Sequence, residues 1–147
     1  MDTRAKYLRP LKVSLMVAML GELGLFLIYG VYLNPEGNLL YKFLWTVLFC
    51  GVGMGASLGA FINLFVTDKL SGSKAIMATT VLSFMILGIA CDMLCISLDQ
   101  HFHYFGGDKS PLIFWTGGLA GSLIGGVLIG WLCFSAKGNM VLDKLKL

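Results

Sequence analysis

Charged residues are scarce in this sequence. Asp, Glu, Lys and Arg make up only 13% of its 147 residues, whereas 57% of the residues are hydrophobic and the mean hydropathy is +0.83. Soluble domains carry about 25% charged residues. The composition therefore excludes an ordinary soluble protein.

Motifs for catalysis are missing as well. The chain contains no C-x-x-C pair, no nucleophile elbow, no phosphate-cradling loop and no pair of histidines inside an apolar run. The sequence thus gives no support for an enzyme, and it indicates no cofactor. Four cysteines fall inside apolar runs, and we interpret them as small apolar residues rather than as redox or disulfide residues. They are Cys50, Cys91, Cys95 and Cys133.

Long apolar runs account for most of the chain. Residues 13–33, 43–66, 75–98 and 112–135 form four such runs. As a helix, each is long enough to cross a hydrocarbon core of about 30 Å. The first run is too long for a signal peptide and has no small-x-small cleavage site, so we expect it to be retained. The sequence predicts an all-α integral membrane protein: one antiparallel four-transmembrane-helix bundle over residues 1–147, in an inner (plasma) membrane or its equivalent.

Basic residues are distributed unevenly about these runs. Nine of the eleven fall on one side of the predicted membrane, and only Lys42 and Lys109 fall on the other. The positive-inside rule then places both termini in the cytoplasm. The net charge of +3 is explained by this topology, and it does not indicate nucleic-acid binding.

Small residues recur at every fourth position in the second and fourth runs. These ridges contain Gly51, Gly55 and Gly59 in the second run, and Gly118, Ser122, Gly126 and Gly130 in the fourth. Such faces let helix backbones approach closely in lipid. We expect the second and fourth runs to pack on each other or on another protein, either a second copy of the chain or another membrane subunit.

Two acidic residues interrupt the apolar runs. Glu22 lies near the middle of the first run with no lysine or arginine at its depth, and Asp92 lies in the outer half of the third. Ionisable groups inside a membrane are energetically unfavourable, so they are candidates for a functional site. Tyr29 falls on the helical face of Glu22, near the depth of Asp92. We interpret Glu22, Asp92 and Tyr29 as a track for protons or cations; the alternative is protonated acids that hydrogen-bond neighbouring helices.

Oxygen and nitrogen donors gather in the longest predicted link, residues 99–111. They include Asp99, His101, His103 and Asp108, and these histidines are the only two in the chain. Two histidines and a carboxylate can hold zinc or copper. We therefore treat Asp99, His101 and His103 as candidate metal ligands, with amphipathic residues at the membrane surface as the alternative.

Two functions remain open on these grounds. In the first, the protein conducts or transports an ion or small solute, coupled to protons or cations through its intramembrane carboxyls. In the second, it is a small non-catalytic subunit of a larger membrane complex and contacts other subunits through its glycine-rich faces. The expected partners are the lipid bilayer and either a second copy or other membrane subunits.

Overall fold

The computed structural model describes residues 3–103 and 110–147, with the side chains of residues 5–103, 115 and 117–147. Its elements are all helical in the described part of the chain, and π-helical segments are marked η. The first span is α1 (Thr3–Leu25) with η1 (Phe26–Tyr32), and the second is α2 (Leu39–Phe43), η2 (Leu44–Met54) and α3 (Gly55–Phe65). The third span is α4 (Gly72–Ser83), η3 (Phe84–Cys91) and α5 (Asp92–Phe102); the fourth is α6 (Ser110–Phe134), followed by α7 (Ala136–Lys144).

Each of the four spans is long and apolar enough to cross a membrane. The predicted all-α fold and the assignment as an integral membrane protein are therefore confirmed. The first helix begins about ten residues before the predicted run, at Thr3 rather than Val13. Arginine and lysine are good helix formers, so helical hydrogen bonding continues through the basic segment that precedes the apolar run.

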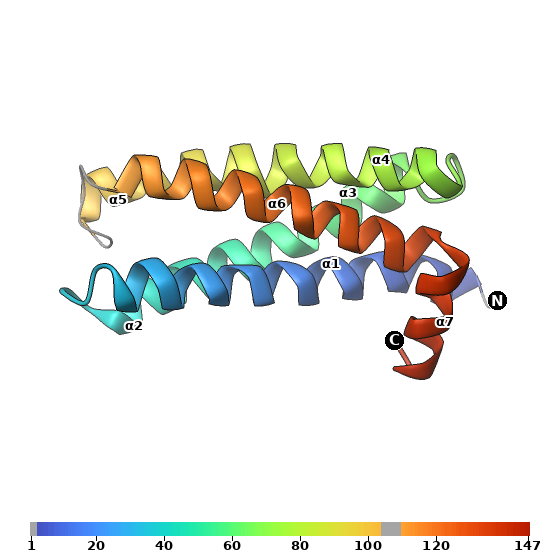
Figure 1. Ribbon diagram of the computed structural model, residues 1–147, viewed down its shortest axis with the longest axis horizontal. Helices are drawn as coiled ribbons and strands as arrows, with labels where there is room; N and C mark the ends of the chain where they lie inside the picture. Colours follow the sequence, from blue (N-terminus) through green and yellow to red (C-terminus); the bar gives the residue numbers. More distant parts are fainter. Residues whose placement is uncertain (1–2, 104–109) are drawn as a thin grey trace.

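The four spans form an elongated antiparallel bundle (Figure 1). The second span packs along α1, and α6 packs along the third span and also contacts α1. Both ends of the described chain lie at one end of the bundle together with the α3–α4 connection (Figure 1). We call this the terminal end, and we call the opposite end, which holds the α1–α2 connection, the loop end.

The glycine-rich ridges determine which helices become neighbours. A Cβ added to Gly59 would lie 2.7 Å from the Cα of Leu11 in α1, and one added to Gly130 would lie 2.9 Å from the Cα of Ile76 in α4. The other ridge residues divide in the same way: Gly51 and Gly55 face α1, whereas Gly118, Ser122 and Gly126 face the third span. The expectation that the second and fourth spans pack on each other is wrong, because each ridge is covered by the span that precedes it in the chain.

Side chains from α1, α3, α4, η3, α6 and α7 form the main hydrophobic core, which extends from the terminal end to Leu87. Leu58 and Ile62 of α3, Ile129 of α6 and Leu142 of α7 are at most 1% exposed. The chain turns sharply at Ser135, whose hydroxyl oxygen accepts a hydrogen bond from the Gly138 amide. This cap turns α7 away from the direction of α6 (Figure 1), so that Leu142 closes the core.

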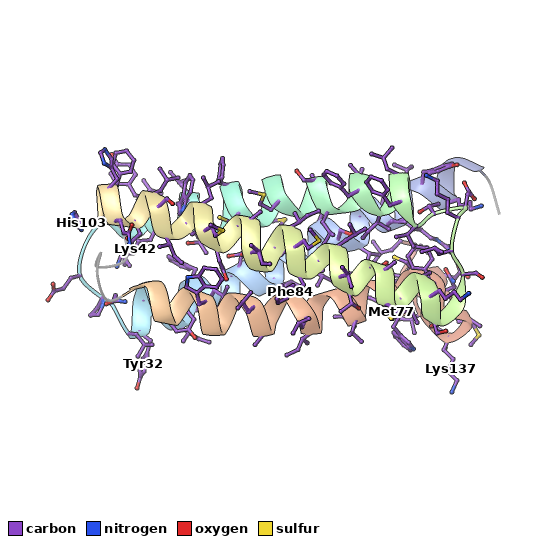
Figure 2. The ribbon with its side chains drawn as sticks, turned by 90° about the horizontal axis from the view of Figure 1, so that it is seen from above. Tyr32, Lys42, Met77, Phe84, His103 and Lys137 are labelled. Carbon is purple, nitrogen blue, oxygen red and sulfur yellow. The ribbon has the colours of Figure 1, made fainter. Side chains whose placement is uncertain are left out.

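A buried lysine closes the loop end. Lys42 is only 1% exposed, and its ammonium group donates to the carbonyl oxygens of Gly30 at 3.1 Å, Asn34 at 2.6 Å and Glu36. Figure 2 shows Lys42 and Lys137 at opposite ends of the bundle. The Lys42 side chain therefore ties the α1–α2 connection to the start of the second span.

Candidate functional site

Glu22 lies where α1 meets its two neighbouring spans. Its side chain is half-buried. A Cβ added to Gly51 of η2 would lie 3.5 Å from the Glu22 Cβ and 3.6 Å from its Cγ. On the other side of α1, Glu22 lines a half-open cavity of about 220 Å³ between α1 and α6, with the exposed Gly21 and Gly121 in its wall. The tightest neighbour of the added Gly51 Cβ is the Met19 Cα at 3.1 Å, so this glycine lets the backbones of α1 and η2 approach closely beside Glu22.

The cavity lies at half the length of the bundle. Ser122 is the middle residue of α6 and Leu87 is the middle residue of the third span, and both line it. Five of its twelve wall residues are glycines: Gly21, Gly24, Gly118, Gly121 and Gly125; apolar side chains such as those of Leu25 and Ile28 form much of the rest. No heavy atom lies within 4 Å of a Cβ added at Gly121. The cavity is large enough for several water molecules or a small solute, and Glu22 is its one acidic wall residue.

Asp92 approaches the same stretch of α6 from the third span. Its side chain is 4% exposed, and its carboxylate occupies the space that a side chain on Gly118 would need. Its Oδ2 atom is buried and has no hydrogen-bond partner among the described residues. The charges of Glu22 and Asp92 are close enough to interact. A buried oxygen without a partner calls for an explanation, such as a bound water or ion.

Tyr29 contacts α6 one residue earlier than Asp92 does. A Cβ added to Gly117 would lie 2.8 Å from the Tyr29 hydroxyl oxygen and 2.8 Å from its ring. Glu22, Tyr29 and Asp92 therefore surround one stretch of α6. Asp99, one of the candidate metal ligands, is buried at the loop end, where its charge interacts with that of Lys42.

The histidines of the candidate metal site do not join Asp99. His101 and His103 are exposed, whereas Asp99 is 1% exposed. Since Asp99 and His101 are two residues apart on α5, they point to different sides of the helix. Among the described residues, these three do not form a group that could hold a metal ion. Asp108 lies outside the described residues.

Three cysteines do come together, and the sequence analysis missed them. Cys50 of η2 and Cys91 and Cys95 of the third span are buried, with Sγ atoms that all lie within 4.8 Å of one another. The four-residue spacing of Cys91 and Cys95 was a visible signal, because it places both on one helical face. The sequence does not show that Cys50 lies opposite that face.

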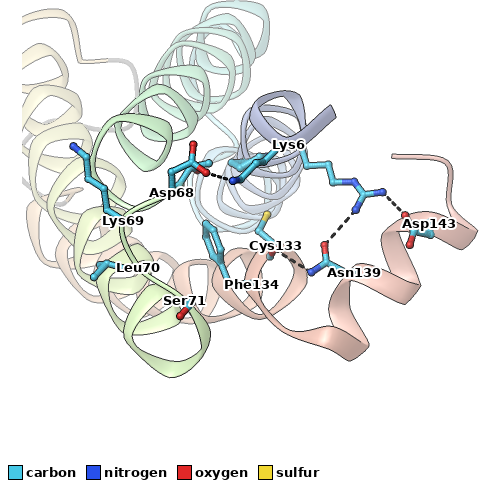
Figure 3. A pocket seen from close by; sticks show the side chains of 12 residues that line it. Lys6, Asp68, Lys69, Leu70, Ser71, Cys133, Phe134, Asn139 and Asp143 are labelled. Atoms are coloured by element: carbon cyan, nitrogen blue, oxygen red, sulfur yellow. Dashed lines mark hydrogen bonds and ion pairs between the residues drawn. The ribbon is translucent and has the colours of Figure 1, made fainter. Parts of the chain in front are cut away.

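A second, larger cavity of about 550 Å³ lies at the terminal end (Figure 3). Lys6 pairs there with Asp68, and Arg9 pairs with Asp143. Arg9 also donates to the Asn139 side chain at 3.3 Å. These groups are already paired with one another, so the contacts in this cavity hold α7 and the α3–α4 connection against α1.

The Glu22 cavity thus combines a central position, a small-residue wall and a carboxyl group. Glu22 makes no ion pair with any described residue. In apolar surroundings, a carboxylate needs a proton, a bound cation or strong hydrogen bonds. This geometry suits reversible binding of a proton or small cation. Comparison with models of protein families, with curated proteins and with solved structures finds no match to this chain.

Proposed function

We propose that this four-span membrane protein moves protons or small cations across the membrane, with Glu22 as the carboxyl that binds them. The observation that carries the proposal is the position of Glu22 on the wall of a cavity at mid-length of the bundle. A carboxyl that only joined helices would be enclosed between them. Glu22 instead borders a space that water or a cation can enter.

The small residues around Glu22 support exchange. Five of the twelve residues that line the cavity are glycines, so part of its wall carries no side chain. Ser122 also lines the cavity, but its hydroxyl donates to the Leu119 carbonyl of its own helix at 2.9 Å. The side chain of Ser122 therefore does not bind Glu22 permanently, and the acid stays available to a mobile ion.

Asp92 and Tyr29 supply further polar groups toward the loop end. Asp92 offers a buried oxygen without a partner among the described residues, and the Tyr29 hydroxyl lies against the next residue along α6. In the proposed path, a cation or proton passes between Glu22 and these groups. Asp92 is the second group that binds the proton or cation, and the Tyr29 hydroxyl is a hydrogen-bond donor on the same path.

Liposome flux with the variant Glu22→Gln tests the proposal. Glutamine keeps the size of the side chain. Its neutral amide cannot be reversibly protonated as a carboxylate can, and it carries no negative charge to bind a cation. We expect wild-type protein in liposomes to carry a flux of H⁺, Na⁺ or K⁺, recorded with internal ion-sensitive dyes under an imposed gradient. Glu22→Gln should lower this flux at least tenfold, and Asp92→Asn should lower it by a smaller factor.

Glu36→Gln is the matched control, because Glu36 has an exposed side chain in the α1–α2 connection. It should conduct as the wild type does. Circular dichroism and size-exclusion chromatography verify that each variant is folded. Absence of flux from wild-type liposomes, or equal flux in wild type and Glu22→Gln, would overturn the proposal.

The subunit hypothesis rested on glycine-rich faces that remain free for other chains. In the structure, Gly55 and Gly59 of the second span and Gly126 and Gly130 of the fourth are covered by helices of the same chain. These four glycines therefore do not favour the hypothesis, which stays a prediction, since Gly53 and Gly121 have no neighbour within 4 Å. Native mass spectrometry after mild solubilisation provides a direct comparison, since a subunit would retain other polypeptides in near-stoichiometric amounts.

A further inference from the structure

The three clustered thiols come from two different spans. Cys50 belongs to the second span, whereas Cys91 and Cys95 belong to the third, and all three are at most 4% exposed. The Sγ atoms of Cys50 and Cys95 are 2.9 Å apart, and the whole group lies within 4.8 Å. Packing of apolar side chains does not require three sulfur atoms to converge on one point.

We propose that Cys50, Cys91 and Cys95 form a binding site for a soft d¹⁰ cation, Zn²⁺ or Cu⁺. Thiolates are preferred ligands of both ions. Three sulfurs bound about 2.3 Å from one metal ion lie about 3.8–4.0 Å from each other. The observed range, from 2.9 Å to at most 4.8 Å, brackets that separation. Side-chain movements of about 1 Å would convert one arrangement into the other.

The residues around the thiols suit a metal site. Met54 and Trp45 pack against the cluster. A methionine thioether is itself a soft ligand. The Trp45 indole N–H is buried and lies close to Cys95. Donors of this kind orient and stabilise thiolate ligands.

Binding changes both the charge and the protonation of the cluster. Three neutral thiols would release three protons to solvent as three metal–sulfur bonds form. Zn²⁺ would leave a site charge of −1, and Cu⁺ would leave −2. The metal would also connect the second and third spans. These two spans pack on each other less extensively than the second packs on the first or the third packs on the fourth. Metal loading should therefore raise the melting temperature of the protein.

Metal content measured by mass spectrometry provides the test. Protein purified with a non-thiol reductant is incubated with Zn²⁺ alone or Cu⁺ alone and then washed with a weak chelator. We expect wild type to retain one ion per chain from at least one incubation, and the two incubations distinguish the metals. Cys50→Ser, Cys91→Ser and Cys95→Ser should each bind at least tenfold more weakly.

Cys133→Ser is the matched control, since Cys133 lines the cavity at the terminal end. It should bind metal as the wild type does. The bound ion should also protect the three clustered thiols, but not Cys133, from alkylation in wild-type protein. Any of three results would overturn the proposal. They are no retained metal in wild type, as much metal retained by Cys50→Ser as by wild type, and a Cys50–Cys95 disulfide in protein purified without reductant. Glu22→Gln should still bind the ion, so this test succeeds or fails independently of the flux experiment.

Discussion

Lys42 carries a buried positive charge at the loop end of the bundle. A lysine beside an apolar run is expected at the membrane surface, with its charge in water. In the structure, its ammonium group is buried and donates to three carbonyl oxygens. Its charge also interacts with buried Asp99. Tertiary packing of the loop end determines this arrangement, and no local pattern around Lys42 encodes it.

The variant Lys42→Met should destabilise the protein. Methionine keeps most of the apolar stem, but it leaves three carbonyl oxygens without their donor. Leaving buried hydrogen-bond acceptors without a charged donor costs about 3 kcal/mol. We expect a decrease of this size in the free energy of unfolding, measured by titration with SDS in mixed micelles. Lys137→Met, at an exposed lysine of the terminal end (Figure 2), should leave stability within about 0.5 kcal/mol of wild type; equal effects would contradict the structural role of Lys42.

At the scale of the helices, π-helical segments explain part of what the sequence could not predict. Three of the four spans contain one: η1, η2 and η3. The wider π turn changes which residues share a helical face. The prediction for Tyr29 assumed a regular α-helix, yet this residue lies in a π segment, as does Cys50. The position of Glu22 was easier to predict, because α1 is regular from Thr3 to Leu25.

Two glycines of α6, Gly126 and Gly121, allow a comparison within one helix. A Cβ added to Gly126 would lie 2.8 Å from the Cα of Thr80 and 2.7 Å from the Cβ of Ser83, whereas one added to Gly121 would have no neighbour within 4 Å. Forcing a methyl group into a packed interface costs about 2 kcal/mol. Gly126→Ala should therefore lower the free energy of unfolding by about that amount.

Gly121→Ala should leave the stability unchanged or raise it by up to about 1 kcal/mol, because alanine is the better helix former. Unfolding in SDS-containing micelles measures both variants. If Gly126→Ala were as stable as Gly121→Ala, the close contact of α6 with α4 would be contradicted.

For the whole molecule, hydropathy was sufficient to predict the number and approximate position of the spans. A segment in lipid must satisfy its backbone hydrogen bonds internally, so a long apolar run has few alternatives to a helix. The choice of neighbours was harder. Small-residue ridges indicate that two backbones approach closely, but they do not identify the partner. Gly55 and Gly126 therefore predicted tight packing without predicting that α1 and α4 would cover them.

The orientation of the bundle is the remaining prediction at this scale. Both ends of the described chain share the terminal end with the α3–α4 connection (Figure 1), which carries Lys69, and with Lys74 in the first turn of α4. The buried ammonium of Lys42 at the loop end is already bound by carbonyl groups. Because the positive-inside rule reflects basic residues near the ends of spans, the terminal end should face the cytoplasm.

In a bacterial host, green fluorescent protein fused after Leu147 should fluoresce, and alkaline phosphatase inserted after Gly37 should be active. An active phosphatase at the C-terminus together with an inactive one after Gly37 would show the opposite orientation.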